Sequence, residues 1–235
     1  MTEIPRPPEP PPYPGDLGPA DATPPMPPPP PPGPPSVSPP GGNYPITLTF
    51  DTPEKIARWR PLLHWLLAIP HFIILYVIDV IAFVMVVLAW FSGVFTGRIP
   101  EGLQKPLAMT QRYNASITTY MFWLREEYPP FTFDGTFTDP GQDPRLHVDV
   151  VPAVEDRSRL TIFFRIFMII PQIFVLFFVS IAVCFVVFIG FFAVIILGRW
   201  PTGLGNFVVG FTRWTTRLNG YFYLLTDEYP PFSTN

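Results

Sequence analysis

The sequence has few of the residues on which disulfide, metal and hydrolytic chemistry depend. One cysteine, Cys184, and three histidines occur among 235 residues. A single cysteine forms no internal disulfide and says nothing about the redox compartment. The histidines are too few for a metal site, so we assign neither a metal nor a cofactor. No nucleophile–base pairing or phosphate-cradling glycine loop occurs, and we therefore expect no enzyme.

Charge is also scarce. Charged residues make up 14% of the chain and the net charge is −3, whereas a soluble domain has roughly 25% charged residues. The balance of charges gives no footprint for nucleic acid, so we expect no nucleic-acid partner. The N-terminus has no basic region followed by an apolar one, which argues against a cleavable signal peptide.

What the sequence does contain is two long apolar runs, Phe72–Phe95 and Ile173–Ile196. The first has one ionisable residue, Asp79, and the second has none. About 20 apolar residues in a helix cross a bilayer core of roughly 30 Å. Both runs are therefore predicted to be transmembrane helices, with the lipid bilayer as a partner.

The two runs belong to a duplicated unit. Each ends in the turn Gly-Arg-x-Pro-x-Gly-Leu, at 97–103 and again at 198–204, and each unit closes on Glu-Tyr-Pro-Pro-Phe, at 127–131 and 228–232. From the entry helix to the end, the halves align without a gap at an offset of 101 residues. This match of glycines, prolines and charges predicts two copies of one structural unit, related by an axis along the membrane normal.

These boundaries divide the chain into four parts: a tail at 1–43, a first repeat at 44–131, a linker at 132–145 and a second repeat at 146–235. The tail holds more than half of the chain's 35 prolines. Proline disfavours both helix and sheet in the tail. The tail also has too little apolar surface to drive folding. We predict a disordered tail that acts either as a spacer or as a docking strip for an aromatic-lined groove of a partner.

Each repeat begins with a predicted strand. Tyr44–Asp51 and Leu146–Val151 alternate apolar and polar residues, and two such strands are able to pair beside the membrane. After the first strand, Thr52 and Pro53 predict the start of a basic, tryptophan-containing interfacial helix. Pro70 predicts a kink where this helix meets the apolar run.

Each repeat ends with a less apolar helical segment, predicted at Gln104–Leu124 and Gly205–Leu225. Two interpretations remain open: the segment crosses back to form a helical hairpin, or it lies along the membrane surface. We favour the hairpin, because its length matches a span and both repeats then share one orientation. That gives about four membrane helices.

Four arginines are candidate lipid or substrate contacts. Arg112 and Arg213 fall in the middle of the second helical segments, where a charge is costly and is paired or faces a cavity. Arg98 and Arg199 lie in the turns and are able to bind lipid phosphate. The structural alternatives are an ion pair between Arg112 and Asp79, snorkelling, and interfacial anchoring by the turn arginines.

The repeated pattern resembles a known family. Arg-Trp-Arg-Pro at 58–61, Gly-Arg-Ile-Pro-Glu-Gly-Leu at 97–103 and Glu-Glu-Tyr-Pro-Pro-Phe at 126–131 are similar to a bacterial membrane family known only as a domain of unknown function, whose unit often occurs in tandem. The second copy departs from the first at 161–165 and has Gln172 in place of His71. The resemblance implies a multi-pass membrane protein and no activity.

We therefore expect an all-α integral membrane protein with two tandem helical hairpins, a small juxtamembrane strand pair and a disordered tail. The resemblance implies a bacterial inner-membrane protein, and the basic residues that flank the spans predict that both termini lie in the cytoplasm. The favoured function is a non-enzymatic accessory or scaffold protein, whose partner is another membrane protein or binds the tail. The alternative is a small transporter, channel or lipid-handling protein that uses the repeat interface.

Overall fold

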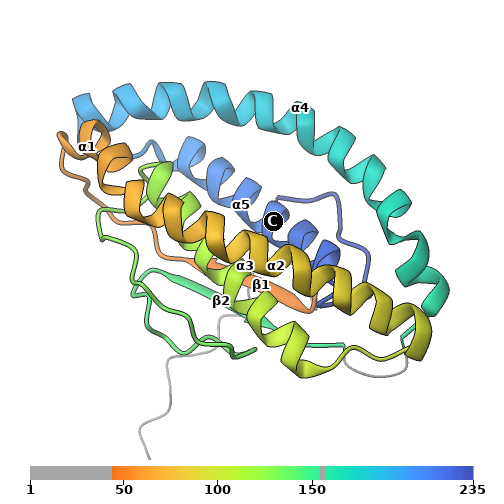
Figure 1. Ribbon diagram of the computed structural model, residues 1–235. Helices are drawn as coiled ribbons and strands as arrows, with labels where there is room; N and C mark the ends of the chain where they lie inside the picture. The colour runs from red at the N-terminus through yellow and green to blue at the C-terminus, as the bar shows by residue number, and fades with distance from the viewer. Residues whose placement is uncertain (1–43, 154–156, 235) are drawn as a thin grey trace, which may run out of the picture. The chain divides into compact units, whose positions relative to one another are not determined.

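The structure, a computed structural model, describes residues 44–153 and 157–234. The predicted disordered tail at 1–43 lies outside the described residues. The described part is mostly helical and includes a small two-stranded sheet (Figure 1). Its elements are β1 (Ile46–Phe50), α1 (Arg60–Leu67), α2 (Ile69–Thr96), α3 (Glu101–Met121), β2 (Leu146–Val150), α4 (Arg159–Leu197) and α5 (Thr202–Phe222).

The segment before α1 differs from the prediction. No helix begins at Thr52, and α1 starts only at Arg60. The reason is tertiary: the Ile56 amide donates a hydrogen bond to the Gly198 carbonyl in the other repeat, at 2.7 Å, which holds this stretch away from the helical conformation. The predicted interruption near Pro70 is confirmed, because α1 ends before Ala68 and α2 begins at the next residue.

Among the described helices, α2 and α4 are the two that are long and apolar enough to cross a membrane. Only 22% and 11% of their most apolar segments are buried in the described protein, whereas the core helix of a soluble protein is mostly buried. On α2, one stripe that includes His71, Ile78 and Ala82 faces the protein, and most of the other side chains are exposed. The helices α3 and α5 do not meet the same test, so the prediction of four membrane helices is not confirmed.

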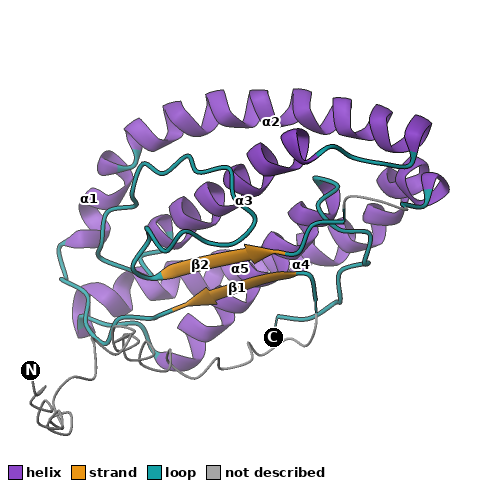
Figure 2. Ribbon diagram, turned by 90° about the horizontal axis from the view of Figure 1, so that it is seen from below, coloured by secondary structure: helices purple, strands orange, loops and turns teal. Residues whose placement is uncertain are grey.

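The described elements form three layers. α3 packs on α2, α5 packs on α4, and α3 and α5 contact each other. Beneath them, β1 and β2 form an antiparallel ribbon, as Figure 2 shows. The apolar positions of both strands are buried against the helices, as the predicted alternation requires.

The two repeats cross each other. α3 of the first repeat contacts β2 of the second, and α5 of the second contacts β1 of the first. The bond from Ile56 to Gly198 has a reciprocal partner at the same offset of 101 residues, because the Arg157 amide donates to the Gly97 carbonyl at 3.1 Å. Such reciprocal contacts define an approximate two-fold axis. It passes through the middle of the ribbon, where Leu48 pairs with Val148.

A two-fold axis perpendicular to the ribbon makes α2 and α4 antiparallel. Near the end of α2, the Trp90 indole donates to the carbonyl of Ile162 near the start of α4, at 3.2 Å. The two helices run in opposite directions in Figure 1. Antiparallel α2 and α4 do not fit the predicted pair of spanning hairpins with one shared orientation; helices that lie flat around a two-fold axis along the membrane normal would still give both repeats one orientation. The antiparallel pairing of β1 with β2 imposes the opposite directions of α2 and α4.

Two glycines end the apolar helices. Gly97 and Gly198 adopt left-handed conformations, with φ of 73° and 68°, and their amides bond back to the carbonyls of Gly93 and Val194. A Cβ atom on Gly97 would lie 3.3 Å from the Arg159 side chain, and one on Gly198 would lie 3.4 Å from the Ile56 carbonyl. Both positions therefore need glycine for their left-handed conformation, while a Cβ atom would meet the other repeat at close to ordinary contact distance.

We predict that Gly97→Ala and Gly198→Ala each lower the unfolding free energy by about 1–2 kcal/mol, the cost of a left-handed L-residue. Thermal unfolding of the protein in detergent micelles, followed by circular dichroism, measures the change. Gly102→Ala is the matched control, because Gly102 lies in the first turn of α3 with open space around it. Equal melting temperatures for all three variants would contradict the role of the left-handed turns.

Candidate functional site

Of the four candidate arginines, Arg112 is the most buried. Its side chain is 7% exposed and extends from α3 to the ribbon. The guanidinium donates to the carbonyls of Val148 and Thr136, at 3.2 Å each, and forms a 3.4 Å ion pair with Asp139. These contacts tie β2 and the linker to α3. The predicted pair with Asp79 is wrong, because Arg112 has these partners instead.

Arg213 is the counterpart of Arg112 in α5. Its Nε donates to the Leu48 carbonyl at 3.1 Å, and Leu48 is the residue that pairs with Val148 at the middle of the ribbon. The two arginines thus bind the central pair of the ribbon reciprocally, each from the other repeat. Their position in the sequence suggested a site inside the membrane; in the structure they join the second helices to the ribbon.

The linker contributes a buried ion pair that the sequence reading missed. Arg125 and Asp143 are both buried, and their charged groups lie 2.7 Å apart. Burial raises the pKa of the Asp143 carboxyl, but Arg125 and a hydrogen bond from Ser116 outweigh it, so the pKa lies below the ordinary value. Arg125 has Thr226 at the equivalent position, so the duplication gave no signal for this pair.

The histidines of the first repeat have packing roles. The His71 ring bonds to the Tyr113 hydroxyl at 2.6 Å, and at the equivalent positions the Trp214 indole donates to Gln172 at 2.9 Å. His64 stacks on Tyr120 and is fully buried. Burial lowers the pKa of His64 to about 4, so it is neutral at pH 7. In the described residues no group of three His, Cys, Asp or Glu side chains is placed to hold a metal.

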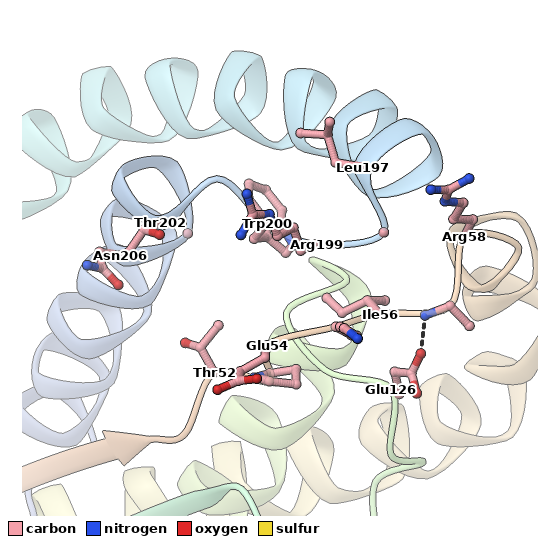
Figure 3. Close-up of a pocket in the computed structure, with 15 residues that line it drawn as sticks. Thr52, Glu54, Ile56, Arg58, Glu126, Leu197, Arg199, Trp200, Thr202 and Asn206 are labelled. Carbon is pink, nitrogen blue, oxygen red and sulfur yellow. Dashed lines mark hydrogen bonds between the residues drawn. The ribbon is translucent and has the colours of Figure 1, made fainter.

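The two turns differ in how they are filled. At the first turn, the buried Gln104 amide donates to the carbonyls of Ile99 and Ala153, at 3.1 and 3.0 Å. At the second turn the equivalent residue is Gly205, which has no side chain. A cavity of about 960 Å³ is found there, between residues 52–58 and the turn at 197–202. We call it the turn pocket (Figure 3).

The turn pocket combines charged groups with an apolar rim. Its lining includes three basic residues, two acidic residues and the last residue of α4: Lys55, Arg58, Arg199, Glu54, Glu126 and Leu197. Trp200 forms part of the wall and is fixed by a 2.9 Å hydrogen bond from its indole to the Trp123 carbonyl. The Glu126 carboxylate accepts a hydrogen bond from the Ala57 amide, which the dashed line in Figure 3 marks.

Arg199 therefore differs from Arg98, its equivalent. Both side chains are exposed, but only Arg199 lines the turn pocket. The structure brings Arg199 together with Lys55 and Arg58, which the sequence did not single out. It does not bring the four predicted arginines together. The signal for the turn pocket in the sequence was the presence of Gly205 in the second repeat where the first repeat has Gln104, in an alignment without gaps.

The fold and its contacts define a class: a duplicated, mostly helical protein with two candidate membrane helices. A family model described as "Domain of unknown function (DUF4389)" matches residues 58–132 and again 159–234. The chain belongs to this family, and each match covers the helical part of one repeat without its strand. No curated protein and no solved structure matches the chain.

We predict that Arg112→Leu lowers the unfolding free energy by about 3 kcal/mol, since it leaves Asp139 as a buried charge without this partner. Arg98→Leu, at an exposed position in the turn, should change it by less than about 0.5 kcal/mol. Denaturant unfolding in micelles compares the two. If Arg112→Leu is as stable as the parent protein, Arg112 is free for a ligand and the structural role is refuted.

Proposed function

We propose that the protein is a non-enzymatic accessory or scaffold protein of a bacterial inner membrane, held in the bilayer by α2 and α4. The observation that carries this proposal is the apolar face, which consists of the exposed large apolar side chains of these two helices. It includes Ile73, Tyr76, Phe83 and Phe95 of α2 and Phe167, Phe174, Phe185 and Phe188 of α4. Exposed apolar surface of this extent marks a membrane or protein contact.

The opposite layer supports one disposition of this face. Around the ribbon lie Asp134, Asp139, Asp143 and Arg145, which make hydrogen bonds or ion pairs there. Hydrocarbon does not accept charged loops or the open edges of a two-stranded ribbon. The ribbon therefore belongs in water, with α3 and α5 at the boundary and with α2 and α4 lying in one leaflet. This is the surface alternative for the second helices.

In this disposition the two-fold axis runs along the membrane normal, as the duplication predicts. The Tyr44 hydroxyl donates to the Glu228 carbonyl at 3.1 Å, so the described chain begins beside its C-terminal segment. Both ends then share the side of the ribbon with Lys55, Arg145 and Arg157. By the positive-inside tendency, we propose that this side faces the cytoplasm.

Membrane binding by the apolar face is tested by flotation of the purified protein with phospholipid vesicles. We predict that Phe83→Lys combined with Phe185→Lys lowers the bound fraction at least tenfold, because each lysine in hydrocarbon costs about 2.5–3.5 kcal/mol. Thr138→Lys, an exposed change in the linker, adds a positive charge away from the apolar face and should have no effect. Undiminished flotation of the double variant would refute this face as the anchor.

Topology is tested with an impermeant thiol reagent in a Cys184→Ser background. Single cysteines at Ser92, Thr138, Thr202 and Ser233 report on both sides of the membrane. If α2 and α4 lie in one leaflet, Thr138 and Ser233 label only in inverted vesicles, and no position labels in intact cells. Labelling of Ser92 or Thr202 from outside would mean that these helices cross the membrane.

A second function, lipid handling, is favoured by the turn pocket. Basic side chains beside the end of an apolar helix suit a phospholipid, whose phosphate binds arginine while its chains stay in the bilayer. We predict that Arg199→Gln reduces the preference for anionic over neutral vesicles about fivefold, since a basic residue at the surface contributes about 1 kcal/mol. Arg98→Gln is the matched control, because it removes the same charge at the first turn, where the Gln104 side chain fills the space. Equal losses in both variants would leave the pocket without a role.

A further inference from the structure

A small polar cavity lies between α3 and α5, where the two-fold axis relates the repeats. Its volume is about 90 Å³, which is room for a few water molecules or one partly hydrated ion. Three pairs of polar residues line it at the repeat offset: Gln111 and Thr212, Asn114 and Thr215, and Thr118 and Asn219. We call it the axial cavity.

Several donors around the axial cavity bond to backbone carbonyls, whereas the Asn219 amide and the Thr216 hydroxyl also line it. The hydroxyls of Thr118, Thr212 and Thr215 donate to backbone carbonyls of their own helices, at 2.8–3.0 Å. The Asn114 amide donates to the Thr110 carbonyl, and the Gln111 amide donates to the Thr216 carbonyl. The side-chain oxygens of these residues keep lone pairs that are able to accept.

One of these acceptors is buried without a partner. Gln111 is 2% exposed, and its Oε1 atom has no hydrogen-bond partner among the described residues. A buried carbonyl oxygen in this condition is destabilising unless a donor or a cation satisfies it. An occupant of the axial cavity that offers positive charge or a proton would satisfy this oxygen.

An exposed carboxylate, which is not itself part of the lining, lies next to the lining residue Asn114. Asp79, the only ionisable residue in the apolar run of α2, accepts a 3.0 Å hydrogen bond from Asn114. No basic side chain in the described ranges forms an ion pair with Asp79. Burial and the neighbouring Asp79 raise the pKa of Tyr223 to about 12, so that hydroxyl remains protonated and supplies no charge. An ionisable residue in a membrane helix needs a counter-charge.

We propose that a monovalent metal cation, Na⁺ or K⁺, binds in the axial cavity beside Asp79 and Asn114. Carboxylate, amide and hydroxyl oxygens are the ligands that hard cations take. One carboxylate matches the charge of a monovalent ion and is too little for a divalent one. The second repeat has Ser180 and Thr215 at the positions of Asp79 and Asn114, so the duplicated chain has a single such site.

The test uses the purified full chain in detergent, with thermal unfolding followed by tryptophan fluorescence. Chloride salts of Na⁺, K⁺ and N-methylglucamine are compared at constant ionic strength. A ligand that binds only the folded state raises the melting temperature with the logarithm of its concentration. We expect this rise with Na⁺ or K⁺ and not with N-methylglucamine. Identical melting in the three salts would mean that the cavity holds no metal cation, and the proposal fails.

Three variants locate the effect. Asp79→Ser, which installs the residue of the second repeat, should abolish the cation-dependent rise, and Gln111→Leu should reduce it. Ser180→Ala, at the equivalent position without a charge, should keep it. A rise that persists in Asp79→Ser overturns the proposed site. If Asp79→Ser does not fold, the ²³Na linewidth of the parent protein and its reversal by excess K⁺ decide: an unchanged linewidth refutes binding, and a reversible broadening supports it.

Discussion

The antiparallel pairing of β1 with β2 is the constraint on which the rest of the structure depends. A two-stranded ribbon alone is marginal in water, and here it is held from one face by the second helices. Arg112 and Arg213 bind the carbonyls of its central pair, each from the repeat that owns the other strand. The pairing fixes the two-fold axis, and the axis in turn forces the apolar helices to run antiparallel.

The places where the repeats diverge fall into two kinds. At some positions both partners of a contact have changed together, so that the hydrogen bond of His71 with Tyr113 becomes one between Trp214 and Gln172. At other positions only one of the two contacting residues differs between the repeats, which leaves an unfilled space or a charge without an ion-pair partner in the described part of the chain. Gly205 in place of Gln104 accompanies the turn pocket, and Asp79 has no acidic counterpart beside the axial cavity. Divergence of the second kind is where ligands are to be sought.

Much of this could be predicted from the sequence, because duplication, strand alternation and the glycine turns are local patterns. The crossing of the repeats could not, since the alternation in Leu146–Val150 does not say which strand is its partner or in which direction it runs. The helix start predicted at Thr52 failed because the Ile56 amide binds Gly198 in the other repeat. The partner of Arg125 lies in the linker, outside the repeated pattern.

Length alone did not decide whether the second helices cross a membrane, since 21 residues suit a span as well as a surface helix. The better criterion is where their polar side chains find partners. Arg112 and Arg213 find theirs on a ribbon whose edges and surrounding acids require water. A helix tied by such bonds to a hydrated layer is held at the boundary as long as the bonds persist. The same bonds that shape the fold therefore favour the proposed disposition, in which α2 and α4 lie flat on the side away from the ribbon, with their apolar face toward the lipid.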